Sequence, residues 1–335
     1  MLDLRRIREN SDAVKKAAAD KGDAVDIDKL LTMDENRRKL IQSADALKAR
    51  RNKVSEQIGE LKKAGKDNQP AIAEMREVSQ EIKSLDLSLR DLENAMKEIL
   101  IQVPNIPHES VPVGPDPSYN KIMKTWGEIP RFDFEVKPHW DIGPELGMLD
   151  FDGGSSLSGS NFIAYRGMGA TLERALINFM IDLHVREHGY TEVWVPTIVK
   201  REMMIGTAQL PKLEEDMYRI EKDDLFLIPT AEVPVTNLHR DRIFKASELP
   251  MYYTAYTPCF RREAGSYGAD TRGLMRIHQF DKVEMVKVVE PETSYDELEK
   301  LLTQAEDVLQ RLEIPYRVLS LATGDLSFAA AKCYD

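Results

Sequence analysis

The sequence has few cysteines and no long apolar run. Cys259 and Cys333 are its only cysteines among 335 residues, which is too few for a disulfide framework. The first residues, MLDLRRIRENSD, lack the apolar core of a secretion signal, and no other run is long enough to span a membrane. We therefore expect a cytoplasmic protein without a membrane segment.

Positive charges are outnumbered by negative ones. The chain has 46 lysines and arginines against 57 acidic residues, a net charge of −11. This balance argues against nucleic-acid binding by the whole surface, although one local basic face remains compatible with it. The length is sufficient for two domains with a sizeable core.

The most regular pattern is a pair of heptad repeats in the first third of the chain. Apolar or long-stemmed residues recur at steps of three and four along two seams, interrupted by Gly65 and Pro70. The first seam is Leu40, Ala44, Leu47, Arg51, Val54, Ile58 and Leu61, and the second is Met75, Ile82, Leu85, Leu89, Leu92, Met96 and Ile99. The pattern predicts an antiparallel helical hairpin over 34–99, an arm about 45 Å long.

The two predicted helices differ in charge. Residues 34–66 hold ten basic and five acidic residues, whereas residues 67–100 hold four basic and eight acidic ones. The simpler interpretation is that salt bridges join the two helices. The other is that the first helix presents a basic face to a polyanion, with these candidate contacts: Arg50, Arg51, Lys53, Lys62 and Lys63.

A proline-dense segment separates the arm from a second region. We expect an N-terminal domain over 1–103, a linker over 104–130 and a second domain over 131–335. In the last of these, TLERALINFMIDLHVREHGY reads as an amphipathic helix, followed by TEVWVPTIV and LFLIPT as strands. A hairpin, another helix and the strand YRVLSLA come after them. The order predicts an α+β fold whose mostly antiparallel sheet is flanked by helices.

The predicted hairpin carries unusual charges. MYYTAYTPCFRRE and LMRIHQFDKVEMVKVV are rich in strand-forming residues, and GSYGADTRG between them has the composition of a loop. Alternate residues of a strand share a face, so Arg261 and Glu263 lie on one side of the first strand. On the second strand the shared face holds Arg276, His278, Phe280, Lys282 and Glu284. Such a face offers partners for a phosphate, a base and an amine.

Two other motifs allow two interpretations each. HVREH matches a pattern of zinc peptidases, but it stands where a helix ends before Gly189, and polar residues are favourable there in any case. Thr230, Ala231 and Glu232 follow the LFLIPT strand. They form either the capped start of a helix or a binding site for an ammonium group and a small hydroxyl.

The run from Phe260 to Glu284 resembles the second signature motif of class II aminoacyl-tRNA synthetases, and HGYTEVWVP resembles the end of their first motif. The long arm, TAEVPVTN, IGTAQLPK and FRREAGSYGADTRGLMRIHQFDKVEM together are similar to the seryl-tRNA synthetase family. The resemblance runs from Leu2 to Asp335. It implies activation of L-serine with ATP and Mg²⁺, transfer to tRNA(Ser) and also to tRNA(Sec), and a homodimer.

The resemblance also implies roles for individual residues. Arg261 would hold the α-phosphate and the seryl carboxylate, Glu263 would lie near the adenine amino group, and Arg276 would meet the γ-phosphate. These three are the expected catalytic residues. Arg262, Ile277 and Phe280 complete the expected ATP site, with Phe280 stacking on adenine. The expected serine contacts are Thr230, Ala231, Glu232, Arg261 and Glu284.

The family's third motif has no counterpart in the sequence, which implies that Mg²⁺ ligands lie outside it. We therefore expect a truncated synthetase whose own activity is low. Three alternatives remain open at this stage: a non-catalytic tRNA-binding relative, a ligase that loads amino acids on a carrier protein, and a zinc peptidase. The arm argues against the carrier-protein ligase, which would lack it.

Overall fold

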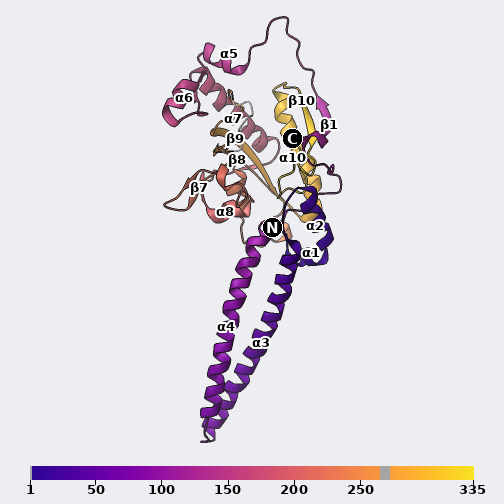
Figure 1. The fold of residues 1–335 in the computed structure, drawn as a ribbon. Coiled ribbons are helices and arrows are strands. Elements are labelled where there is room, and N and C mark those ends of the chain that lie inside the picture. Colours follow the sequence, from indigo (N-terminus) through magenta and orange to yellow (C-terminus); the bar gives the residue numbers. More distant parts are fainter. Residues whose placement is uncertain (1, 265–271) are drawn as a thin grey trace. The chain divides into compact units, whose positions relative to one another are not determined.

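A computed structural model describes residues 2–264 and 272–335 in two compact units (Figure 1). One unit comprises Met1–Lys121 with Leu321–Cys333, and the other Ile122–Ser320 with Tyr334–Asp335. Most of the loop expected between the hairpin strands, residues 265–271, lies outside the described residues. The domain boundaries expected from the sequence stay a prediction.

The first unit contains the arm. It begins with α1 (Leu4–Glu9) and α2 (Ser11–Asp20), and two long helices follow, α3 (Ile27–Lys63) and α4 (Gln69–Leu100), which run side by side in Figure 1. Ala44 and Val54 of α3 and Ile82 and Met96 of α4 are buried, as the heptad pattern predicts. Arg51 of the expected seam is exposed instead, because its long charged stem extends into solvent. The predicted helical hairpin is confirmed.

The base of the arm is fixed by a small core and by one buried carboxylate. The core cluster consists of Leu2, Ile7, Val14, Ile27, Leu30, Met96 and Val103. Beside it, the side chain of Asp34 is fully buried and contacts three guanidinium groups, at 2.9 Å from Arg8 and 3.3 Å from Arg37 and Arg38. Ion pairing offsets the cost of burying the charge. These contacts join α1 to α3.

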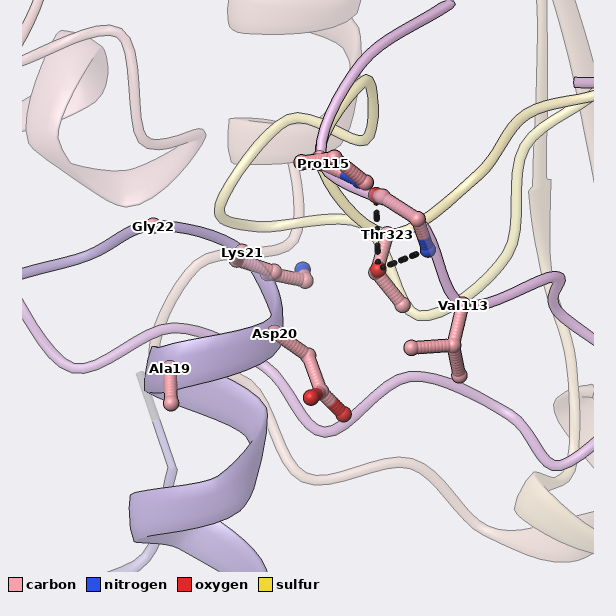
Figure 2. Close-up of a pocket in the computed structure, with 9 residues that line it drawn as sticks. Ala19, Asp20, Lys21, Gly22, Val113, Pro115 and Thr323 are labelled. Carbon is pink, nitrogen blue, oxygen red and sulfur yellow. Dashed lines mark hydrogen bonds between the residues drawn. The ribbon is translucent and has the colours of Figure 1, made fainter. Parts of the chain in front are cut away.

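The proline-rich segment is tied to the rest of the first unit by backbone hydrogen bonds. Asn105 N–H donates to Phe328, His108 N–H to Ala331, and Thr323 N–H to Pro112. Where the segment passes Thr323, Figure 2 shows the threonine hydroxyl bonded to the backbone of Gly114. A cavity of about 280 Å³ opens there, lined by Ala19, Asp20, Lys21, Gly22, Val113, Gly114, Pro115, Thr323 and Gly324. The sequence predicted a linker here, whereas its backbone pairs with residues more than two hundred positions away.

The second unit is a mixture of short helices and strands. Its helices are α5 (His139–Glu145), α6 (Phe151–Ser158), α7 (Met168–Arg186), α8 (Arg201–Gly206), α9 (Glu232–Asn237) and α10 (Ser294–Arg311). Its strands are β1 (Lys121–Trp126), β2 (Leu149–Asp150), β3 (Ala164–Tyr165), β4 (Thr191–Glu192), β5 (Ile198–Lys200), β6 (Arg219–Ile220), β7 (Leu225–Leu227), β8 (Met251–Phe260), β9 (Gln279–Val288) and β10 (Tyr316–Ser320). The predicted α+β class is confirmed.

The sheet that carries the hairpin has the strand order β4-β8-β9. β8 and β9 pair antiparallel over ten residues, from Met251 opposite Val288 to Phe260 opposite Gln279, and β4 joins β8 in parallel. A second sheet has the order β5-β7-β6, with antiparallel pairs. The single strand expected over TEVWVPTIV is divided between the two sheets. Pro196 lies between the parts, and proline supplies no N–H to a sheet.

Helix α7 is amphipathic, but only part of its apolar side is covered. Ile181, Leu183 and His184 are buried, whereas Leu172, near the start of the predicted stripe, is 50 % exposed. Gly189 follows the helix with φ of +76°, the left-handed conformation expected of a residue just after a helix. Periodicity identifies the apolar side of a helix and not what lies against it.

Helix α10 is attached to the sheet through a buried carboxylate. Tyr252 Oη donates to Glu297 at 2.7 Å, and Lys287 and Lys300 contact the same group at 2.9 and 2.6 Å. Burial alone would raise the pKa of Glu297, but these three contacts outweigh it and lower the pKa to about 2. Glu297 therefore stays ionised and holds β8, β9 and α10 together.

Candidate active site

The hairpin strands are shorter than the sequence predicts. β8 ends at Phe260 and β9 begins at Gln279, although Arg261 N–H still donates to the His278 carbonyl at 3.0 Å. Residues 272–278 turn instead of extending. The expectation that Arg276 alternates with Phe280 along one strand was therefore wrong. Ile277, expected at the ATP site, is buried in this turn.

Gly273 and His139 explain the turn. Gly273 has φ of +71°, and a Cβ atom at this position would lie 2.1 Å from Nε2 of His139. The same Nε2 accepts a hydrogen bond of 2.7 Å from the N–H of Leu274. Only glycine permits both the backbone conformation and the close approach. The end of the loop that leads into β9 is thereby attached to the start of α5.

Phe280 and Arg261 form the first part of the site. The Arg261 guanidinium lies 5.0 Å from the centroid of the Phe280 ring, within the range of a cation–π contact. Cys259 faces Phe280 across the strands and is fully buried. Phe280, Lys282 and Glu284 are alternate residues of β9 and share a face, as predicted. Phe280 and Glu284 stand roughly 13 Å apart along this face at 3.3 Å per residue.

Glu263 and Arg276 form the second part. They make an ion pair of 2.9 Å across the loop. Glu263 has φ of +50°, a left-handed conformation that costs a non-glycine residue about 1 kcal/mol or more. The neighbouring Arg262 is exposed, and its N–H donates to the Asp216 carbonyl at 2.8 Å. Strained backbone of this kind is concentrated at functional sites.

Thr230 and Glu284 form the third part, together with Lys282. Thr230 Oγ1 donates to Glu284 Oε2 at 2.6 Å, and Lys282 Nζ donates to the same hydroxyl at 2.8 Å. Thr230 Oγ1 also accepts from the N–H of Glu232 at 3.1 Å, the expected capping contact at the start of α9. Ala231 is fully buried, in a core cluster with Ala255. The capping role and the site position of Thr230 are thus compatible.

Glu232 has a perturbed carboxyl group. Its side chain reaches solvent, yet surrounding protein atoms desolvate it, and this desolvation raises its pKa, with a further contribution from the Glu284 charge. Within residues 2–264 and 272–335, no hydrogen bond or ion pair engages this carboxylate. A cation placed beside it would relieve both unfavourable effects.

The two histidines of HVREH bond to each other. Their Nδ1 atoms are 2.9 Å apart, and Nε2 of His188 contacts Asp307 at 3.1 Å. Burial lowers the pKa of His184 to about 4. Nowhere in the described part of the chain do three His, Cys, Asp or Glu side chains group in a way that could hold a metal ion. The structure gives the zinc peptidase interpretation no support.

The arm residues divide into two kinds. Three ion pairs cross the hairpin: Arg50 with Glu74 at 2.6 Å, Arg37 with Glu93 at 3.0 Å and Lys48 with Asp86 at 3.6 Å. Salt bridges therefore do join the two helices. The other predicted contacts are exposed and make no ion pair with any described residue: Arg51, Lys53, Lys62 and Lys63. They remain available for an external polyanion.

Sequence reasoning missed three residues that shape the site. Lys282 was placed on the correct face but given no role, and only its contact with Thr230, 52 positions away, indicates one. Asp216 accepts from Ala264 N–H at 2.8 Å, and His139 holds the turn at Gly273. Each of these contacts joins segments that are distant in the sequence, so no local sequence pattern predicts it.

The comparisons with known proteins agree over the whole chain. A model of the seryl-tRNA synthetase N-terminal domain matches residues 1–107, and one of the tRNA synthetase class II core domain (G, H, P, S and T) matches residues 213–335. A curated serine–tRNA ligase of Geobacter sulfurreducens is 55% identical over 335 residues, covering 100% of this chain and 79% of its own.

Two solved structures are also similar. Seryl-tRNA synthetase from Pyrococcus horikoshii complexed with ATP has a TM-score of 0.91 and 35% identity, and the match covers 100% of this chain and 80% of that one. Cytoplasmic serine–tRNA ligase from Naegleria fowleri in complex with AMP has a TM-score of 0.86 and 27% identity, with coverage of 100% and 81%. Both structures hold an adenine nucleotide.

Proposed function

The chain belongs to the seryl-tRNA synthetase family, and from this premise we propose that the face of β9 with its flanking loops activates serine with ATP for ligation to tRNA. The observation that carries the proposal is the order of groups along one strand: an aromatic ring with a guanidinium over it at Phe280, then a carboxylate at Glu284. Their separation of roughly 13 Å suits an extended aminoacyl-adenylate, with its base at one end and its amino acid at the other.

We assign the nucleotide to the first two parts of the site. Phe280 offers its ring to adenine, and Arg261 beside it is placed for the α-phosphate. Arg276 would exchange its contact with Glu263 for the γ-phosphate, since a phosphate, like a carboxylate, accepts bidentate hydrogen bonds from a guanidinium. Arg262 and Ile277 flank these residues. Backbone held in place before the nucleotide arrives needs less reorganisation during the reaction.

The reaction would be attack of the serine carboxylate on the α-phosphorus with release of pyrophosphate. Arg261 is the group placed for both reactants, and its fixed positive charge would stabilise the negative charge that develops between them. Holding both reactants on one strand face supplies proximity and orientation. A hydroxyl at the 3′ end of tRNA(Ser) or tRNA(Sec) would then attack the seryl carbonyl, forming an ester and releasing AMP.

We expect Mg²⁺ to accompany ATP, as it does in most reactions of nucleoside triphosphates. The described residues provide no group of three metal-binding side chains, so none of them is assigned as a ligand. No step above depends on the ion.

We further propose that two copies of the chain associate through the second unit. Many large apolar side chains of this unit are exposed, including Met168 at 70 %, Leu157 at 82 % and Trp194 at 89 %. Exposed apolar side chains mark an interface where they form one contiguous patch, and we propose that these do. Sedimentation of the purified protein should give the mass of a dimer, and a monomer at micromolar concentration would contradict this. The two cysteines form no disulfide within the described residues, which suits a reducing compartment such as the cytoplasm. No helix within the described residues is long and apolar enough to cross a membrane.

The test of the proposed function is exchange of labelled pyrophosphate into ATP, measured with each of the twenty amino acids. We expect exchange with serine alone, at a low rate in the 335-residue chain, followed by ligation of serine to tRNA(Ser). Exchange without transfer to tRNA would favour the carrier-protein ligase, whereas tRNA binding without exchange would favour the non-catalytic relative.

The affinity for serine should depend on pH through Glu232. Its pKa is raised, so it is protonated over a range in which an ordinary glutamate is charged, and serine binding should strengthen as pH rises through this range. Isothermal titration with serine at several pH values measures the effect. In the Glu232→Gln variant binding should be weaker and its dependence on pH in this range should disappear. An unchanged profile would remove Glu232 from the ammonium site.

A further inference from the structure

Lys282 places a positive charge close to the proposed site for the ammonium group of serine, which it would repel. The proposed substrate brings an ammonium group, and Lys282 places another ammonium within 2.8 Å of both Thr230 and Glu284. The side chains of Lys282 and Glu284 are 31 % and 22 % exposed, so water screens their charges only in part. The lysine needs an explanation in terms of what the site selects.

Hydrogen-bond capacity shows which atoms remain available. Thr230 has one O–H proton, donated to Glu284, and two lone pairs, which accept from Lys282 and from the N–H of Glu232. Its hydroxyl is therefore saturated. Glu284 uses Oε2 for both contacts, and no group among the described residues donates to its Oε1. A free acceptor atom thus lies beside a compensated charge.

Small residues of β8 lie beside Glu284 and Lys282. Ala255 faces Glu284 across the strands and Thr257 faces Lys282, and both are buried. The side chains of Lys282 and Glu284 both contact Thr230, and these contacts fix Oε2 of Glu284 in place.

The two carboxylates differ in compensation. Glu232 has no ion pair among the described residues, and the charge of Lys282 only partly opposes the rise of its pKa, whereas Glu284 is paired with Lys282 directly. A cationic substrate group is consequently attracted to Glu232, and the Glu284–Lys282 pair is neutral as a unit. A neutral hydroxyl can donate to Oε1 of Glu284, while a second ammonium there would meet the charge of Lys282 at close range.

We propose that Lys282 determines specificity by neutralising Glu284, so that the side-chain subsite accepts a neutral hydroxyl donor and rejects a cationic group of the same size. The inference rests on the proposed function, because it takes Glu284 and Glu232 as contacts of serine. It adds a role for a residue that need not touch the substrate itself.

The test compares serine with L-2,3-diaminopropionate, in which an amino group replaces the hydroxyl. Both dissociation constants are measured by calorimetry over the same series of pH values as for Glu232, and they are compared where both amino groups of the analogue are protonated and serine still binds. In the Lys282→Met variant the preference for serine over the analogue should fall by about tenfold or more, or 1.4 kcal/mol. The Lys282→Arg variant keeps the charge and should keep the preference.

The matched control is Lys124→Met, which removes a lysine from another Lys–Glu pair, with Glu306 at 2.7 Å. Its preference should equal that of the unmodified protein. ATP binding reports that each variant is folded, and Lys282→Gln replaces the methionine variant if that one is not. Two outcomes would overturn the proposed role of Lys282 and leave the proposed function untouched. One is an unchanged preference for serine in the neutral variant, and the other is loss of binding of both serine and the analogue while ATP still binds. Failure of the unmodified protein to bind serine would instead overturn the proposed function, and this inference with it.

Discussion

Replacing Arg261 with alanine should lower serine-dependent pyrophosphate exchange by about 10² to 10³. Arg261 is the only guanidinium that we place at both reacting groups, and its contact with Phe280 fixes its position before substrates bind. Loss of one preorganised electrostatic contact typically has an effect of this size. The rate is measured at saturating ATP and serine, so that weaker binding does not account for the loss.

The chain offers a close control for this variant. Arg242 lies 4.9 Å from the centroid of the Phe244 ring, nearly the geometry of Arg261 over Phe280, but it has no assigned role in the site. Arg242→Ala should leave exchange within about twofold, as surface substitutions usually do. Near-normal exchange in Arg261→Ala would remove this arginine from the mechanism, whatever the control shows.

Replacing the four exposed basic residues of α3 that were predicted to contact a polyanion and make no ion pair with described residues should weaken binding of tRNA(Ser) about 10²-fold at low salt. Charging of the tRNA should fall with it. The effect follows from the loss of four phosphate contacts, and the plot of log affinity against log salt should be shallower by about four. Filter binding over a range of salt concentrations measures both quantities. The substitutions to glutamine are at Arg51, Lys53, Lys62 and Lys63.

A control of equal charge is available on the other helix of the arm. Four basic residues of α4 are also exposed and make no ion pair with described residues: Arg76, Lys83, Arg90 and Lys97. Changing these to glutamine alters net charge by the same amount, but α4 is acidic overall and should contribute little. Pyrophosphate exchange should persist in both variants. If the two weakened tRNA binding equally, the effect would come from net charge and the basic face of α3 would have no special role.

Local patterns in the sequence were sufficient for the arm and for the face that Phe280, Lys282 and Glu284 share. A heptad seam is repeated often enough to specify both helices, and the alternation from Phe280 to Glu284 predicts a shared face. The limits of the strands were not predicted. Strand propensity continues beyond Gln279 toward Met275, but the close contact of Gly273 with His139 turns the chain there.

Contacts between distant segments account for the rest. The pairing of Lys282 with Thr230 depends on where the segment between β7 and α9 meets β9, and composition says nothing about this. Glu263 shows the same limit, because its left-handed backbone contradicts the extended conformation that its neighbours favour. Tertiary structure overrides local preference at these positions. The roles given to the site residues remain predictions until the variants above are measured.

The pairing of the proline-rich segment has a consequence for the order of folding. Residues 27–100 make mainly contacts close in sequence, so the arm can form as soon as they are available. By contrast, Lys21 Nζ donates to the carbonyl groups of Ser327, Phe328 and Ala330, and Asn105 pairs with Phe328, each across more than two hundred residues. Closing a loop of that length has an entropic cost that must be met before the contacts form. On the ribosome, the helical hairpin would therefore be complete long before the unit that contains it.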